Sequence, residues 1–230
     1  MSVVAAAVVP AAPALLPGIG GAADPLADLR ERSRDLVRRT VAGTKGATRL
    51  IVVGSGPITR AWPADAPSGA ARFTTGAVPE GALPTALEIG REFAPSEGGE
   101  TELWSIAADA SPRQCAELGR RLTTGGPSIL VCVADGPATL TEKAPGHLQP
   151  DAAPFAAGLA RALADGDTTA LAGLDPATCE RLWMRGRPAL QVLAAAAPDL
   201  AGELVAEESP FGVQYLLARW RLAGRGRAQR

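Results

Sequence analysis

Four side chains that can act as acids or bases lie in one polar segment of the sequence, residues 135–147. They are Asp135, Glu142, Lys143 and His147. Carboxylates, an ammonium group and an imidazole can share general acid–base work if a loop brings them together. However, the segment begins with Asp-Gly-Pro, which is typical of a plain turn. His147 also has no second histidine or cysteine near it. We favour the turn, and an acid–base site stays the alternative.

A second candidate is the Gly54-Ser55-Gly56 sequence, which follows a short apolar run. Glycines let backbone amides approach an anion, so this pattern can hold a phosphate. The details do not fit, because the third small residue of a dinucleotide fingerprint falls on Thr59 and no acid lies near position 75. Ser55 also has no base within its motif that would make it a nucleophile. The glycines therefore predict a tight turn.

The composition limits the chemistry and the partners of the chain. It has 230 residues and one histidine, which excludes a histidine-rich metal site. Lys and Arg number 23 against 24 Asp and Glu, so the net charge is −1 and no overall field attracts nucleic acid or an anionic membrane. Residues 223–230 are expected to form a solvated basic tail. Nucleic acid is not an expected partner.

The cysteines and the N-terminal segment indicate a cytoplasmic protein. Cys115, Cys132 and Cys179 are far apart, odd in number and set in apolar patterns. We therefore expect buried reduced thiols, with neither a disulfide nor a zinc site. The apolar run of residues 2–16 has no positive charge before it and is interrupted by prolines, unlike a signal peptide or a membrane span. A membrane is not an expected partner.

The elements that must position these residues alternate between strands and helices. Short β-branched runs bounded by glycine and proline predict strands, and apolar residues at helical spacing predict the helices between them. This order favours one α/β domain, residues 1–222, with a mostly parallel or mixed central sheet between two layers of helices. The expected strands are 3–9, 50–53, 102–107, 129–134, 203–207 and 213–220. The expected helices are 24–43, 83–91, 111–124, 151–164, 167–174, 176–183 and 189–197.

The topology selects the loops that matter. In open α/β sheets the functional groups lie beyond the carboxyl ends of the parallel strands. Those loops are residues 10–13, 54–57 and 135–137. We therefore expect Ala11 or Ala12, Ser55 and Asp135 to meet at one edge of the sheet, around a small and mildly polar pocket.

Five segments in this order resemble a known family. They are AAAVVPAAPALLPGIGG at 5–21, LIVVGSGP at 50–57, ILVCVADGPATLTEKAPGHLQPDAAPF at 129–155, ALAGLDPATCERLWMRGRPALQVLAAAA at 170–197 and PFGVQYLLARW at 210–220. The chain is similar to actinobacterial proteins that resemble the catalytic B subunit of class III extradiol ring-cleavage dioxygenases. That superfamily also includes the Memo-like proteins.

The resemblance implies a mixed sheet flanked by helices and a site for ferrous iron. Active members hold Fe(II) with two histidines and a glutamate, and a further histidine acts as acid–base catalyst. The corresponding loops here are residues 10–13, 54–57 and 135–138, and none contains histidine. Because this oxygen chemistry needs a face of two imidazoles and one carboxylate, we expect no iron cofactor in this protein.

These observations favour a non-catalytic, pseudoenzyme-like member of the family that binds a small molecule or a protein. The alternative is an enzyme with changed chemistry in the same cleft, with Asp135, Glu142, Lys143 and His147 as its candidate groups. A dioxygenase-type oxidoreductase with a non-standard metal site is a further alternative. The relatives often pair with themselves or with a small subunit, so a homo-oligomer is a possible assembly.

Overall fold

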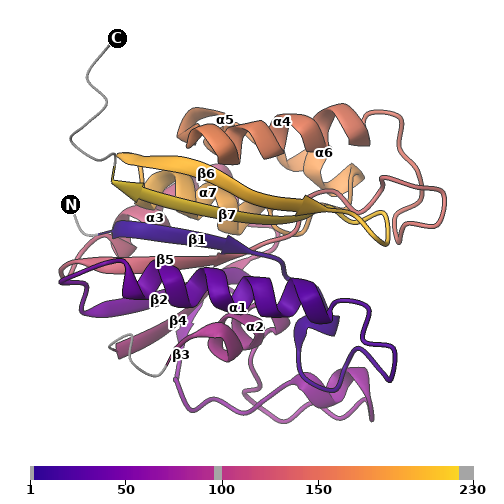
Figure 1. Ribbon diagram of the computed structural model, residues 1–230, viewed down its shortest axis with the longest axis horizontal. Coiled ribbons are helices and arrows are strands. Elements are labelled where there is room, and N and C mark those ends of the chain that lie inside the picture. The colour runs from indigo at the N-terminus through magenta and orange to yellow at the C-terminus, as the bar shows by residue number, and fades with distance from the viewer. Residues whose placement is uncertain (1–2, 96–99, 223–230) are drawn as a thin grey trace.

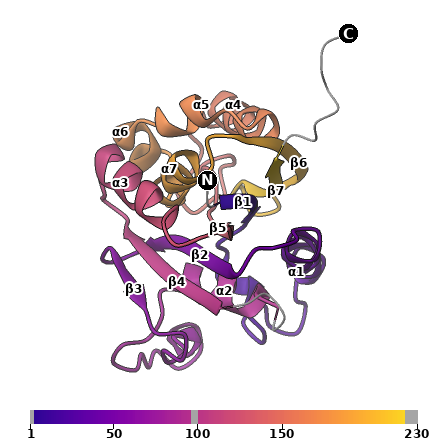
Figure 2. The same ribbon diagram turned by 90° about the vertical axis from the view of Figure 1, so that its left-hand side faces the viewer.

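Across residues 3–95 and 100–222, which the computed structural model describes, the chain forms one seven-stranded sheet (Figures 1 and 2). The strand order is β3-β4-β2-β5-β1-β7-β6. The strands are β1 (Val3–Val9), β2 (Arg49–Gly56), β3 (Arg60–Trp62), β4 (Glu100–Ala107), β5 (Ser128–Val133), β6 (Leu200–Glu208) and β7 (Tyr215–Leu222).

The middle of the sheet is parallel and its borders are antiparallel. Strands β4, β2, β5 and β1 run in the same direction, whereas β3 pairs antiparallel with β4. Strand β7 pairs antiparallel with β1, and β6 with β7. Strand β2 has the four-residue run Leu50–Val53, completely buried on both faces, as expected for a central parallel strand.

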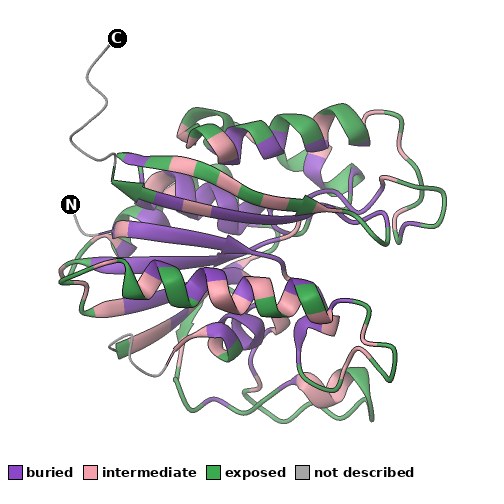
Figure 3. Cartoon of the chain, in the orientation of Figure 1, coloured by how far each residue is buried: buried purple, intermediate pink, exposed green. Residues whose placement is uncertain are grey.

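Helices cover both faces of the sheet, so the three-layer α/β prediction is confirmed. Alternate residues of β2 enter two separate cores: Leu50 and Val52 pack with α1 (Ala27–Ala42) and α2 (Thr85–Phe93). Ile51 and Val53 pack on the other face with α3 (Pro112–Leu122) and α7 (Arg187–Ala196). The same layer contains α4 (Ala152–Asp165), α5 (Thr168–Ala172) and α6 (Pro176–Arg181) (Figure 2). Figure 3 shows the buried strands between helices with exposed outer faces.

Besides shifts of a few residues at the ends of several elements, the start of α1 and the presence of β3 differ from the sequence predictions. Helix α1 begins at Ala27, because Asp24 does not cap it: its carboxylate accepts hydrogen bonds from Arg30 at 2.6 and 2.7 Å. Strand β3 was not predicted, since its three residues carry no readable alternation. It is held to β4 by a 2.7 Å hydrogen bond from Trp62 Nε1 to Ser105 Oγ.

The prediction for the three cysteines agrees with the part of the chain that the structure describes. Cys115, Cys132 and Cys179 are buried free thiols. In the described ranges no helix has the length and apolar character needed to cross a bilayer. The expected basic tail, residues 223–230, lies outside the described residues.

The close contact between β2 and α2 depends on Gly54. A Cβ atom at this position would lie 2.6 Å from Ala86 Cβ, so the strand and helix can approach only because Gly54 has no side chain. We expect Gly54→Ala to lower the free energy of unfolding by about 1–3 kcal/mol in urea denaturation. Gly158→Ala is the matched control, because nothing lies within 4 Å of its added Cβ and alanine favours a helix interior. Equal effects of the two substitutions would contradict this account of the packing.

Candidate functional site

Three strand ends surround a cavity of about 450 Å³. Ala11 lies beyond β1, Ser55 is the second-last residue of β2, and Asp135 lies beyond β5; all three line this space, which we call the strand-end cavity. The pairing brings them together, because Val133 of β5 is opposite Val9 of β1 and Gly54 of β2. Strands β1 and β5 therefore end at the same level, and β2 continues two residues beyond it, to Gly56.

Asp135 is the acidic group of the strand-end cavity. The backbone N–H of Ala11 donates a 2.7 Å hydrogen bond to Asp135 Oδ1, which ties the loops after β1 and β5 together. Burial raises the pKa of Asp135 to about 7, and the Ala11 hydrogen bond opposes part of that shift. The pKa of the buried Tyr215 hydroxyl is raised by burial and by the neighbouring Asp135 carboxylate. Near neutral pH, Asp135 can therefore act as a hydrogen-bond donor or acceptor.

The hydroxyl group of Ser55 has a structural partner. Ser55 Oγ donates a 2.7 Å hydrogen bond to the carbonyl oxygen of Arg185, in the connection between α6 and α7. The one histidine of the sequence does not line the cavity, so Ser55 has no imidazole base there. This arrangement gives no support to nucleophilic catalysis by Ser55.

Two arginines complete the polar lining. The guanidinium of Arg72 is fixed by hydrogen bonds to the carbonyl oxygens of Gly69 and Leu83, at 2.7 and 2.8 Å. Arg185 is exposed, and its guanidinium has no hydrogen-bond or ion-pair partner among the described residues. Two guanidinium groups accompany one carboxyl whose pKa is raised by burial to about 7, so positive charge predominates in the strand-end cavity.

The other candidate residues lie elsewhere. Ala12 is buried under the short 3-10 turn at Pro13–Leu15 and does not line the cavity, so Ala11 is the lining residue of that loop. Glu142, Lys143 and His147 are exposed and do not reach the strand-end cavity. Of the four acid–base candidates, the structure therefore places Asp135 alone in it.

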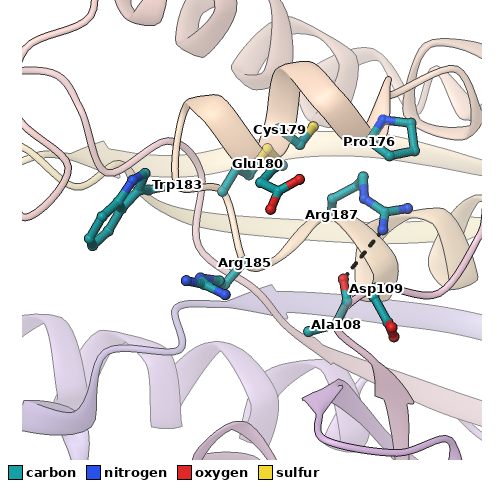
Figure 4. Close-up of a pocket in the computed structure, with 9 residues that line it drawn as sticks. Ala108, Asp109, Pro176, Cys179, Glu180, Trp183, Arg185 and Arg187 are labelled. Atoms are coloured by element: carbon teal, nitrogen blue, oxygen red, sulfur yellow. Dashed lines mark hydrogen bonds between the residues drawn. The ribbon is translucent and has the colours of Figure 1, made fainter.

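A second cavity of about 240 Å³ adjoins the first, and Ala108 and Arg185 line both (Figure 4). Trp183 and Arg185 lie on one side of it and Arg187 on the other. Arg187 is buried, and its guanidinium donates to the Ala110 carbonyl at 2.8 Å, to the Ala108 carbonyl at 3.3 Å and to Gln191 Oε1 at 2.7 Å.

The thiol in this second cavity is protonated at neutral pH. Cys179 is buried, and burial raises its pKa to about 11 although Arg187 opposes the shift. A thiol in this state is a poor nucleophile. Across the described ranges, no three His, Cys, Asp or Glu side chains are grouped as metal ligands.

Sequence reasoning missed Arg72, Arg185 and Arg187. Arg185 and Arg187 belong to the Trp-Met-Arg-Gly-Arg-Pro segment at residues 183–188, between two predicted helices. The available signal is the glycine between two arginines just before a proline that can start a helix. That signal predicts a sharp connection, but it does not indicate which cavity the connection faces.

Comparisons with known proteins establish the fold. No protein-family model and no curated protein matches the chain. Among solved structures, JW3007, an uncharacterized protein from Escherichia coli K12, aligns with a TM-score of 0.52. The alignment covers 95% of this chain and 99% of that protein at 15% sequence identity. Similarity at this level supports a shared fold, and the dioxygenase resemblance stays a prediction.

The raised pKa of Asp135 makes stability depend on pH. An unfolded aspartate has a pKa of about 3.9, so between that pH and about 7 the folded protein binds more protons than the unfolded chain. Its contribution to stability is therefore present in acid and is lost as the pH rises through about 7. Relative to Asp135→Asn, we expect the wild-type free energy of unfolding to fall by on the order of 2–3 kcal/mol from pH 4.5 to 8.

Urea denaturation at pH 4.5, 6 and 8 measures this difference. The asparagine variant keeps an oxygen that can accept the Ala11 N–H, so the comparison isolates the charge. Asp199→Asn changes an exposed aspartate and serves as the matched control. Wild type and Asp135→Asn with parallel pH profiles would show that Asp135 ionises as an ordinary aspartate.

Proposed function

We propose that this protein is a non-catalytic binding protein that holds a small organic molecule in the strand-end cavity. The observation that carries the proposal is the lining itself: three parallel strands deliver Ala11, Ser55 and Asp135 to a cavity of about 450 Å³ without an imidazole. In the resembling dioxygenases, histidines stand at the corresponding loops. A retained cavity with changed lining supports binding as the remaining activity.

Ferrous iron does not fit this lining. The ionisable donor that could bind a cation is Asp135, while Arg72 and Arg185 add two positive charges to the same cavity. The single histidine of the chain is exposed in another loop. Non-haem Fe(II) oxygenases use two imidazoles and a carboxylate on one face, and those groups are not assembled here. The proposed function therefore does not involve iron.

The lining defines the kind of molecule that fits. Pro57, Pro84, Ala86 and Val133 supply apolar walls, and Asp135 can exchange a hydrogen bond with a hydroxyl group. Pockets with apolar walls and a few placed polar groups are typical of small-molecule sites. Catechol is a suitable probe, because it combines a flat apolar ring with hydroxyl groups and because the resembling family cleaves it.

The second candidate function is an enzyme with changed chemistry in the same cavity. Asp135 favours it, since a pKa of about 7 suits a general acid or base at physiological pH. Glu142, Lys143 and His147 do not reach the cavity, so this candidate has one chemical group there. Conversion of the bound probe to a product would favour the enzyme over the binding protein.

Calorimetric titration with catechol tests the proposal. We expect saturable binding that Ala11→Phe reduces at least tenfold, because the phenyl ring would occupy the cavity that Ala11 lines. Ala177→Phe adds the same ring to an exposed position on α6 and is expected to bind as wild type does. Circular dichroism and thermal unfolding check that both variants fold.

Measurements of oxygen uptake and metal content distinguish catechol binding from the ring cleavage that the resembling dioxygenases catalyse. Protein purified without a histidine tag is expected to contain far less than one iron per chain and to consume no oxygen with catechol. Stoichiometric iron together with ring cleavage would overturn the proposal. Catechol binding that is equal in wild type and Ala11→Phe would overturn the assignment of the cavity.

A further inference from the structure

The connection between α6 and α7, residues 182–186, is held in an unusual conformation by several independent contacts. Trp183 has φ +53°, a left-handed backbone conformation that costs energy for a bulky residue. Gly186 lies directly against the loop after β5, where a Cβ atom would meet the Asp135 carbonyl oxygen at 2.3 Å. Any larger residue at position 186 would push the connection away from the strand-end cavity.

Arg187, the first residue of α7, fixes the C-terminal end of the same connection. Its buried guanidinium contacts three neutral oxygens, those of Ala108, Ala110 and Gln191. Gln191 in turn donates to the carbonyl oxygens of Ala172 and Leu174, at 3.0 and 2.9 Å. The network joins the loop after β4, the end of α5 and the start of α7. It fixes the backbone on the C-terminal side of Arg185.

The Ser55 hydroxyl fixes Arg185 itself, but only through its backbone. The carbonyl oxygen of Arg185 accepts the Ser55 hydrogen bond at 2.7 Å, while its guanidinium is exposed and without a partner among the described residues. Strained backbone persists where the surroundings determine it fully, and it gathers at ligand sites. Here the group presented by the strained segment is a free guanidinium that lines both cavities.

We propose that Arg185 binds the anionic group of the ligand, a carboxylate or a phosphate, while the rest of that ligand occupies the strand-end cavity. This inference rests on the proposed function and names the chemical class of the ligand. A guanidinium presents paired N–H donors that match two oxygens of a carboxylate or phosphate. Its position between the cavities makes it a residue that determines specificity.

The surrounding charges place the anion on the strand-end side of Arg185. Apart from Arg185 itself, the second cavity is lined by the guanidinium of Arg187 and by the carboxylates of Asp109 and Glu180, so these negative charges outnumber the positive charge of Arg187 and oppose a ligand anion. On the strand-end side, Arg72 adds a second positive charge. Asp135, the acid of that cavity, has a pKa of about 7 and can take up a proton when an anion binds nearby.

Benzoate and benzamide test this inference, because they share size and shape but differ in charge. We expect wild type to bind benzoate more tightly than benzamide in calorimetric titrations, with an affinity that falls as sodium chloride is added. Arg185→Gln is expected to weaken benzoate binding at least tenfold, since it removes a charge-assisted hydrogen bond. Benzamide binding should change little.

Two further variants exclude indirect effects. Arg185→Lys retains the charge without the paired donors and should restore part of the lost benzoate affinity. Arg120→Gln removes an exposed charge from α3 and should leave both affinities unchanged. Replacing benzoate by inorganic phosphate shows whether the site accepts carboxylate, phosphate or both, and binding of either one that depends on Arg185 supports the inference.

The outcomes separate this inference from the proposed function. Anion binding that Ala11→Phe abolishes and Arg185→Gln leaves intact would overturn the role of Arg185 while supporting the cavity. The role of Arg185 would also be overturned if wild type bound benzoate and benzamide with equal affinity. A loss of benzoate affinity in Arg120→Gln as large as that in Arg185→Gln would overturn it as well. Catechol carries no carboxylate or phosphate. Loss of catechol binding in Ala11→Phe therefore tests the strand-end cavity separately from anion binding by Arg185.

Discussion

The site depends on the register of three parallel strands. Val133 of β5 is level with Val9 of β1 and with Gly54 of β2, so β1 and β5 end together and β2 ends two residues further on. The hydrogen bond from the Ala11 N–H to Asp135 then joins the loops after β1 and β5. A slip of one residue in either pairing would turn every side chain of a strand to the opposite face and separate these loops. The buried alternation of β2 between the two cores keeps that register.

Glycine and arginine residues bring the helices close to the ends of β1, β2 and β5, where the strand-end cavity lies. Gly54 allows α2 to approach β2, and Gly186 allows the connection before α7 to touch the backbone of Asp135. The buried Arg187 then fixes that connection through neutral oxygens. A buried cation with no carboxylate partner is costly, so the network is a weak source of stability. Its structural result is the position of Arg185 between the two cavities.

The sequence predicts the layers and the strand ends of this fold, because both depend on local patterns. The runs at 50–53 and 129–134 are apolar and bounded by turn residues, and they form the central strands β2 and β5. The edge strand β3 has three residues and depends on the contact between Trp62 and Ser105, which are far apart in the sequence. The start of α1 depends likewise on Arg30, which engages Asp24 and leaves Ala27 to begin the helix.

The same reasoning explains which site residues sequence patterns could find. The topological rule selects Ala11, Ser55 and Asp135, since each follows a strand that is recognisable by itself. The rule does not identify Arg185. The position of Arg185 at the cavity results from three contacts together: the close approach of Gly186 to Asp135, the hydrogen bond from Ser55, and the hydrogen bonds of Arg187. Glu142, Lys143 and His147 are close to Asp135 in sequence, but the polar loop that carries them leaves them exposed.

Energetics favour a functional reason for Asp135 over a structural one. Among the described residues, the hydrogen bond that its carboxylate accepts comes from the Ala11 N–H and needs only an oxygen acceptor, which asparagine also provides. Burial of the carboxyl makes its ionised form unfavourable, as the pKa of about 7 records. Asp135 lowers stability at neutral pH and lines the same cavity as the guanidinium of Arg185, which has no partner among the described residues; this combination favours the proposed ligand site. The charge pattern of the strand-end cavity is therefore the property that a ligand must match.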